Sequence, residues 1–210
     1  MKPPEKTKQR TAYHHGDLRA TLIESAVALI HRRGDSQFSL RDLAGELGVS
    51  HVSVYRHFSD KAALMNAVAV RGFSMLTQAL TDAAQGWDAD PTQQLARQGV
   101  AYLSMAGRYP GHFAAMFAPM VSQHGQTQEL QAASEQAYAV VLQTVLRRLQ
   151  VASATAPAVE TEALRVWALV HGLACLQLSG NLSACLGRDL SQASEAELQS
   201  LMAGLLGPAA

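Results

Sequence analysis

Hydrophobic residues recur at helical spacing along most of this chain, and alternating patterns of the kind that predict strands are nearly absent. Glycine and proline fall at wide intervals between these helical segments. The pattern predicts an all-α protein of about nine helices. We expect three of them to form an N-terminal helix-turn-helix domain and the others to form a larger C-terminal helical bundle.

Start and stop signals set the expected limits of these helices. Asp90-Pro91 is a strong start signal because proline is favoured at the first helical position. Ser194 and Glu197 have the spacing of a capping box. The expected helices cover residues 17–33, 40–47, 51–58, 61–85, 91–109, 112–117, 126–149, 157–179 and 195–206.

Residues 39–61 predict two short helices joined by a tight turn. Ser39 stands at an N-cap position, and Asp42 three residues later can complete a capping box. Gly48 follows the last apolar position, where a left-handed residue commonly ends a helix. Ser50 can then cap the second helix. This arrangement is typical of a helix-turn-helix, which places its second helix in the major groove of DNA.

The second helix of this pair has an apolar edge and a mainly polar outer face. Val54 and Phe58, four residues apart, are expected to face inward together. The outer face then carries hydrogen-bonding, aromatic and cationic groups of the kinds that contact DNA: His51, Val52, Ser53, Tyr55, Arg56 and His57. From spacing alone, an ordinary helical hairpin with a solvated face is the alternative interpretation.

The segment from Tyr13 to about Leu76 resembles the DNA-binding domain of the TetR family of transcriptional repressors. The matching pattern is Leu40-x-x-Leu43-Ala44-x-x-Leu47-Gly48-Val49-Ser50, then Val54-Tyr55-x-His57-Phe58-x-x-Lys61-x-x-Leu64. Before it, Tyr13-His14-His15-Gly16-Asp17-Leu18-Arg19 resembles the start of the first helix in one branch of the family. Ser39 departs mildly from the pattern because many relatives have threonine there, but both hydroxyls can cap a helix.

The resemblance implies that the partner is a double-stranded DNA operator, and it implies roles for single residues. Phosphate contacts are implied for Ser39, Tyr55, His57 and Lys61. Base contacts are implied for Arg41, His51, Val52, Ser53 and Arg56, the last of which also fits a phosphate role. Two alternatives remain: Tyr55 as a residue that packs beside the turn, and Arg41 as a solvated charge.

Charge is unevenly distributed, although 17 Lys/Arg and 17 Asp/Glu give the whole chain a net charge of zero. Residues 1–61 hold ten Lys/Arg against seven Asp/Glu, a net of +3, and the remainder has a net of −3. The expected domains are a basic, disordered arm at residues 1–12, the DNA-binding domain at 13–76, and a ligand-binding and dimerisation domain at 77–210. The arm fits either a DNA contact or a solubilising tail.

Two later segments resemble the C-terminal domain of this family: Tyr109-Pro110 with Phe113-x-x-Met116-Phe117, and Trp167-x-x-x-His171-Gly172-Leu173. That resemblance implies a homodimer that encloses a pocket for a small-molecule effector. Effector binding would shift the helix at 61–85 and release a palindromic operator, so the expected function is a ligand-controlled, sequence-specific repressor.

The candidate pocket residues are aromatic, methionine and histidine side chains: Met105, Phe113, Met116, Phe117, Trp167 and His171. Residues of these types at helical spacing are also common in ordinary cores, and this alternative stays open. Ala163, Ala168 and Gly172 are small enough to permit close approach of helices in a dimer's four-helix bundle.

Other classes of protein find little support in the sequence. It has no glycine-rich phosphate loop, nucleophile elbow or set of metal ligands, so we expect no catalysis, cofactor or metal. Cys175 and Cys185 are expected to be free thiols, and they leave open a DNA-binding regulator controlled by thiol oxidation or by a protein partner. No apolar run is long enough to span a bilayer or act as a signal peptide, so we expect a cytoplasmic protein without a membrane partner.

Overall fold

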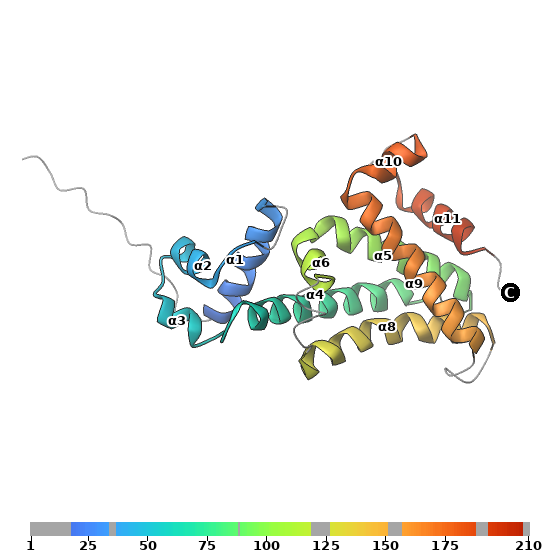
Figure 1. Ribbon diagram of the computed structural model, residues 1–210. Coiled ribbons are helices and arrows are strands. Elements are labelled where there is room, and N and C mark those ends of the chain that lie inside the picture. The colour runs from blue at the N-terminus through green and yellow to red at the C-terminus, as the bar shows by residue number, and fades with distance from the viewer. Residues whose placement is uncertain are drawn as a thin grey trace, which may run out of the picture.

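The computed structural model describes residues 18–33, 37–87, 89–118, 127–150, 157–187 and 193–207. These residues form ten helices and no strand (Figure 1). The helices are α1 (Leu18–Arg33), α2 (Leu40–Leu47), α3 (His51–Tyr55), α4 (Lys61–Ala84), α5 (Pro91–Arg108), α6 (Pro110–Met116), α8 (Gln128–Arg148), α9 (Pro157–Leu178), α10 (Asn181–Leu186) and α11 (Glu195–Leu206). The predicted all-α fold is confirmed, with one helix more than expected. The arm at residues 1–12 and the segment 13–17 lie outside the described residues.

Local capping fixes the helix-turn-helix. The Ser39 hydroxyl accepts a hydrogen bond from the Asp42 amide at 3.1 Å, and the Ser39 amide donates to Asp42 Oδ2 at 2.8 Å. Gly48 ends α2 at φ 63°, a left-handed conformation that costs glycine little. The Ser50 hydroxyl then caps α3 by accepting from the Ser53 amide. The capping pattern predicted from the sequence is therefore confirmed.

Helix α3 is shorter than the sequence predicts, because it ends at Tyr55 and not at Phe58. The amides of His57 and Phe58 still bond to the Val54 carbonyl, so the chain continues as a turn. Asp60 then adopts an extended backbone, and its side chain accepts a hydrogen bond from the Ala63 amide at 2.8 Å, so that α4 begins at Lys61. The predicted inward pair is confirmed, since Val54 and Phe58 are both buried.

Helix α4 connects the three N-terminal helices to the bundle without a break (Figure 1). It packs against α1 at one end and against α5, α6 and α8 further along. The expected domain boundary at residue 76 therefore falls inside a continuous helix, and it stays a prediction.

Helix α5 occupies the centre of the bundle, in contact with α4, α8, α9 and α11. The α11 contact is close, because a Cβ added to Gly99 would overlap Met202 Cε. Buried Arg148 holds the end of α11 by donating to the carbonyls of Leu206 and Gly207 while it pairs with Glu162. Among the described helices, none combines the length and apolar character needed to cross a membrane.

The helix that the sequence did not predict is α10. It has only six residues and lies between Gly180 and Gly187, which both adopt left-handed conformations. Six residues make fewer than two turns, so hydrophobic periodicity gives almost no signal over that length.

Candidate DNA-binding interface and effector pocket

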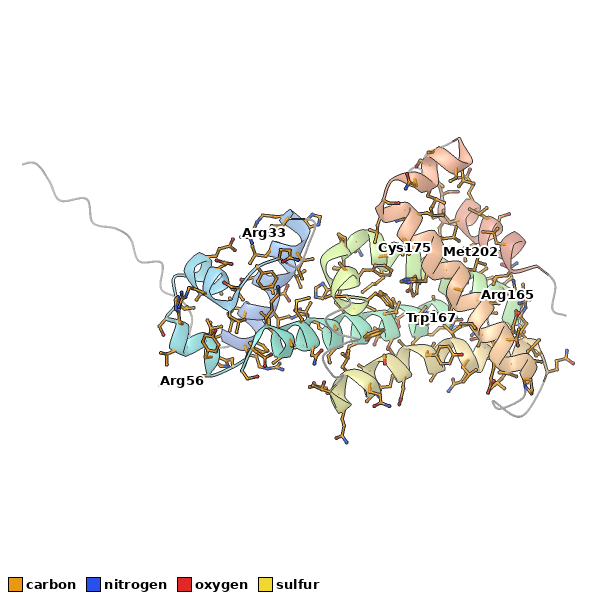
Figure 2. The ribbon with its side chains drawn as sticks, viewed as in Figure 1. Arg33, Arg56, Arg165, Trp167, Cys175 and Met202 are labelled. Atoms are coloured by element: carbon orange, nitrogen blue, oxygen red, sulfur yellow. The ribbon has the colours of Figure 1, made fainter. Side chains whose placement is uncertain are left out.

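The outer face of α3 is exposed, as its sequence predicts. Val52 is 64% exposed and Tyr55 is 55% exposed, although both carry large apolar groups. His51, Arg56 and His57 are exposed beside them, and Figure 2 shows Arg56 at the end of the molecule opposite α11. Valine methyls suit the thymine methyl in the major groove, and histidine and arginine donate hydrogen bonds to base edges or phosphates.

Ser53 is half-buried and already takes part in a local contact. Its hydroxyl lies 2.7 Å from the Ser50 hydroxyl, next to the cap of α3. A hydroxyl has one donor and two acceptor sites, so beside this contact the Ser53 hydroxyl retains capacity for two further bonds. The predicted contact of Ser53 with a base must therefore form while Ser53 keeps its hydrogen bonds to Ser50, which cap α3.

The start of α2 lies beside the start of α4. Ser39 and Arg41 are exposed at the first turn of α2, and Lys61 is the first residue of α4. The Lys61 ammonium lies 4.8 Å from the centre of the Phe38 ring, next to Ser39 in the chain. Hydrogen bonds from the Ser39 backbone and side chain lower the pKa of Asp42, which keeps the capping carboxylate ionised. The predicted DNA contacts at the start of α2 and at the start of α4 therefore lie close together.

Four of the six predicted pocket residues meet in an aromatic cluster: Phe113, Phe117, Trp167 and His171, together with Tyr102 from α5. His171 stacks on Phe113 at 5.6 Å between ring centres and lies 4.4 Å from Phe117. Tyr102 meets Trp167 edge-on at 5.6 Å, and its hydroxyl lies 3.0 Å from His171 Nδ1. Burial lowers the pKa of His171 and raises that of Tyr102, so both side chains are neutral near pH 7.

The two predicted methionines lie elsewhere in the core. Met116 packs on α4 where Gly72 leaves room, because a Cβ on Gly72 would lie 2.6 Å from the Met116 sulfur. Met105 is buried on α5. The assignment of the six residues to an effector pocket stays a prediction, and the geometry also fits the core interpretation for both methionines.

A mainly apolar hollow that contains a buried amide lies beside this cluster. Leu80 of α4, Val141 of α8 and Val166, Trp167 and Val170 of α9 line it, together with Leu95, Gln98, Gly99 and Tyr102 of α5. Gln98 is only 2% exposed, and neither its Oε1 nor its Nε2 has a hydrogen-bond partner among the described residues. The free volume is about 10 Å³, close to the minimum for one water molecule, so a larger ligand requires the helices to move apart.

The sequence did not predict Gln98, because a glutamine on an amphipathic helix is ordinarily assigned to the solvent side. One signal was present: Gln94, Gln98 and Tyr102 are spaced four residues apart and therefore share a face of α5. Trp167 is the predicted pocket residue that lines this hollow.

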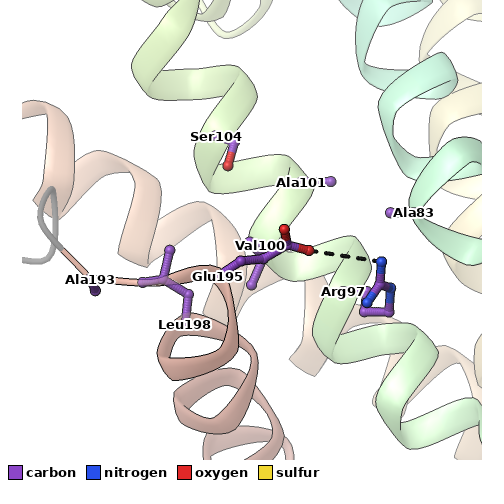
Figure 3. A pocket seen from close by; sticks show the side chains of 8 residues that line it. All are labelled: Ala83, Arg97, Val100, Ala101, Ser104, Ala193, Glu195 and Leu198. Atoms are coloured by element: carbon purple, nitrogen blue, oxygen red, sulfur yellow. Dashed lines mark ion pairs between the residues drawn. The ribbon is translucent and has the colours of Figure 1, made fainter.

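A second hollow, of about 430 Å³, lies between α5 and α11 near the end of α4 (Figure 3). Arg97 and Glu195 face each other across it at 3.8 Å, and Arg97 also lies over the Trp87 ring. The predicted pocket residues are not among those that line it. Its lining includes the charged side chains of Arg97 and Glu195 and the hydroxyl of Ser104.

Five leucines on the last three helices are exposed: Leu164, Leu176 and Leu178 on α9, Leu186 on α10 and Leu205 on α11. Leu164 is 66% exposed. Ala168 and Gly172 are also exposed on α9, but Ala163 is fully buried within its own bundle. Ala163 is thus wrong as a candidate for close contact with a second subunit, because it faces the core.

Comparisons with known proteins agree with this architecture. The family model described as "Bacterial regulatory proteins, tetR family" matches residues 22–68, which include α2 and α3. The model described as "Tetracyclin repressor-like, C-terminal domain" matches residues 95–201, about half of the chain. The chain belongs to the TetR family. The resemblance inferred from the sequence is confirmed at family level, although the Trp167-x-x-x-His171-Gly172 pattern itself stays a prediction.

Individual relatives of this TetR-family chain are distant. The "Probable acrEF/envCD operon repressor" of Escherichia coli is 29% identical over 92 residues, which make up 44% of this chain and 42% of that protein. The match therefore spans less than half the length of that relative. A structure of a protein of unknown function from a Rhodococcus species is 28% identical, with a TM-score of 0.70, 95% of this chain covered and 100% of the other.

A TetR family transcriptional regulator from Thermus thermophilus, PfmR, shares the fold. The TM-score is 0.64 at 17% identity, with 88% of this chain covered and 96% of the other. At this identity the similarity concerns the fold alone.

Proposed function

We propose that this TetR-family protein is a sequence-specific DNA-binding transcriptional regulator, a dimeric repressor that a small-molecule effector releases from a palindromic operator. The exposed outer face of α3 is the observation that carries the proposal. Val52 and Tyr55 are exposed to solvent on a capped helix, and Val54 on the opposite edge of that helix is fully buried. Such a helix is held rigidly and presents its side chains outward, as entry into a major groove requires.

The proposed DNA contacts divide into two sets by chemistry. Lys61, Ser39, Tyr55 and His57 would hold phosphates, which set orientation and register without reading sequence. Arg41, His51, Val52, Ser53 and Arg56 would read base edges. The net charge of +3 over residues 1–61 favours approach of this domain, rather than of the bundle, to DNA.

The exposed leucines of α9, α10 and α11 support a homodimer through the surface of these helices. Monomeric proteins rarely leave several large apolar side chains exposed together, because burying each one removes apolar area from water. In a two-fold symmetric dimer, the second copy of the chain contributes the same leucines to the interface. Two helix-turn-helix domains would then meet half-sites about one turn of DNA apart, roughly 34–36 Å.

The hollow at Gln98 supports a mainly apolar effector with one group that pairs with an amide. A buried amide without partners costs free energy, and a ligand that satisfies it recovers that cost. Leu80 of α4 lines the same hollow, while Lys61 begins α4 at the DNA-binding end. A ligand that enlarges the hollow therefore displaces α4, and it acts by preferring the conformation that fits the operator less well.

Cys175 supports thiol oxidation as a second means of control. It is a free, exposed cysteine, and its sulfur lies 3.6 Å from His171 Nε2 in the aromatic cluster. Oxidation would add polar oxygen atoms next to His171. If this mechanism operates, mild peroxide should lower operator affinity in the wild type but not in Cys175→Ser, while Cys185→Ser should respond like the wild type.

Selection of bound sequences from a random DNA pool tests the proposed function. It should be done with the purified protein at about 150 mM salt, where nonspecific binding is weak. An enriched palindrome with half-sites about one turn apart is the expected result. A folded, dimeric protein that enriches no sequence, with or without a library of small molecules present, would contradict the proposal.

A further inference from the structure

A cleft of about 630 Å³ lies between the DNA-binding helices and the bundle. One wall is α1, the second is α4, and the third is the corner between α5 and α6. The α1 and α6 helices face each other above α4 in Figure 1 and are in contact. This cleft is separate from the hollow at Gln98, with which it shares no lining residue.

The environment of His112 on α6 indicates that this cleft binds a ligand. His112 lines the cleft, yet the residue is only 4% exposed. Neither Nδ1 nor Nε2 has a hydrogen-bond partner among the described residues. Buried polar groups in proteins are nearly always hydrogen-bonded, and those that are not require a specific explanation. A ligand that forms a hydrogen bond with the His112 imidazole supplies such an explanation.

The charged groups of the cleft indicate the sign of the charge on that ligand. Arg71 on α4 is paired with Glu24 on α1, with 2.6 Å between Nη1 and Oε1. Arg108 at the end of α5 adds a second, exposed guanidinium. Two guanidinium groups against one carboxylate leave one positive charge, which suits a monoanion. Burial lowers the pKa of His112, so its ring is neutral and offers one N–H donor.

The remaining surface of the cleft indicates the body of the ligand. Val27 on α1 and Met75 on α4 supply apolar side chains to the same cleft. A fully polar anion such as phosphate would leave this surface without a partner, whereas an aromatic or aliphatic group would bury it.

We infer that the interdomain cleft is a second ligand site, which binds a small organic carboxylate with an apolar body. The carboxylate pairs with Arg108 and Arg71, His112 donates or accepts one hydrogen bond, and the apolar body lies on Val27 and Met75. The site goes beyond the proposed operator and effector sites, and its ligand is distinct from the apolar, amide-binding effector expected at Gln98.

Occupancy of the cleft has a consequence for DNA binding that rests on the proposed function. The α1 and α6 helices already touch closely, since a Cβ added to Gly111 would lie 2.7 Å from the Val27 carbonyl oxygen. A ligand held by Arg71 and Val27 on one side and Arg108 and His112 on the other joins both domains. It therefore fixes the orientation of the helix-turn-helix relative to the bundle, and it shifts operator affinity by its preference for one orientation.

Benzoate is a suitable probe, with benzamide as its neutral counterpart. Calorimetric titration of the full-length, DNA-free protein should show benzoate binding and much weaker benzamide binding. The substitution Arg108→Gln removes a charge from an exposed side chain and should keep the fold, yet weaken benzoate binding by about tenfold. Arg108→Lys should restore much of the affinity. Arg97→Gln, which alters the hollow between α5 and α11, is the matched control and should bind benzoate like the wild type.

A second readout locates the probe without a variant. The imidazole Cε1–H resonance of His112 should shift on addition of benzoate, and a shift confined to other histidines would place the probe elsewhere. The inference is overturned if the wild type binds no benzoate, if benzamide binds equally well, or if Arg97→Gln weakens binding as much as Arg108→Gln. Because DNA is absent, these outcomes are independent of operator recognition. Failure to enrich a palindrome would in turn leave the binding result intact.

Discussion

The Lys61 ammonium lies over the Phe38 ring, 4.8 Å from its centre, and this contact joins the start of α4 to the residue before the α2 cap. A cation on an aromatic face contributes about 0.5–1 kcal/mol at an exposed site. The contact limits the freedom of a long side chain, so less entropy is lost when Lys61 meets a phosphate. Phe38 thereby positions a proposed DNA contact while it remains buried in the core.

The substitution Lys61→Ala should weaken binding to all DNA sequences to a similar degree. Loss of one phosphate contact should lower the slope of log affinity against log salt by about one unit. The measurement is fluorescence anisotropy with specific and random duplexes over a series of salt concentrations. A changed base preference with an unchanged salt slope would exclude the phosphate role. Phe38→Leu is the control, because it keeps the charge and should keep the slope.

The substitution Arg41→Ala should instead alter sequence preference. A bidentate arginine–guanine pair contributes about 1–3 kcal/mol of discrimination, so preference should relax at one base pair in each half-site. Repeating the random-pool selection with the variant measures this directly. An unchanged profile at every position would remove Arg41 from the residues that read bases and leave it as a solvated charge.

Dimerisation can be separated from DNA binding with two equally exposed residues. Leu164 on α9 is 66% exposed and Val52 on α3 is 64% exposed. Leu164→Glu places a charge on the proposed dimer face and should shift the sedimentation equilibrium toward monomer, since an unpaired charge in an interface is costly. Val52→Glu should leave the dimer intact and lose operator binding through repulsion by phosphates. A Leu164→Glu protein that sediments as an unchanged dimer would exclude this face.

Much of the DNA-binding domain could be predicted from sequence because its signals are local. The Ser39–Asp42 capping box involves residues three apart, and Gly48 ends α2 by its own conformation. The exposed face of α3 followed from the spacing of Val54 and Phe58 alone. These features need no knowledge of the rest of the molecule.

The proposed ligand sites depend on tertiary contacts. Most of their features therefore could not be predicted from local sequence signals. Gln98 shares its hollow with side chains of α4, α8 and α9, which only the packed bundle brings together. The cleft at His112 exists only because α6 returns to contact α1, some 80 residues away in the chain. The sequence predicts a short helix over residues 112–117, but that the His112 imidazole has no hydrogen-bond partner among the described residues is visible only in the packed structure.

Acidification should destabilise the fold through His112 and His171. Burial lowers the pKa of both, with Glu24 and Arg71 facing His112 and with Tyr102 and Cys175 facing His171. The unfolded chain takes up these protons near pH 6.5, its usual histidine pKa, whereas the folded chain takes them up only at lower pH. The contribution of the two neutral histidines to the free energy of unfolding is therefore complete above about pH 6.5. It is lost as the pH falls toward their pKa in the folded protein.

Urea unfolding of the wild type, His112→Asn and His171→Asn between about pH 7 and pH 5 checks this expectation. Each variant should show a smaller loss of unfolding free energy on acidification than the wild type, even if its stability at pH 7 is lower. Parallel pH profiles for all three proteins would show that other groups cause the acid sensitivity.

Two glutamines four residues apart on α5 provide a matched test of the Gln98 hollow. Gln94 and Gln98 are 1% and 2% exposed, so both amides are buried to the same degree. Gln94 donates to the Ala84 carbonyl at 2.7 Å and accepts from Arg147, whereas Gln98 has no partner among the described residues. Replacement by leucine keeps a similar volume and removes the amide in both cases.

The two substitutions should act in opposite directions. Gln98→Leu removes an unsatisfied buried amide and should raise the unfolding free energy by about 1–3 kcal/mol. Gln94→Leu removes both the hydrogen bond to the Ala84 carbonyl and the one from Arg147, and it should lower that free energy by about 1–3 kcal/mol. Urea unfolding measures both. Equal destabilisation by the two variants would mean that the Gln98 amide is satisfied in solution, and the case for an amide-binding effector at this hollow would then fail.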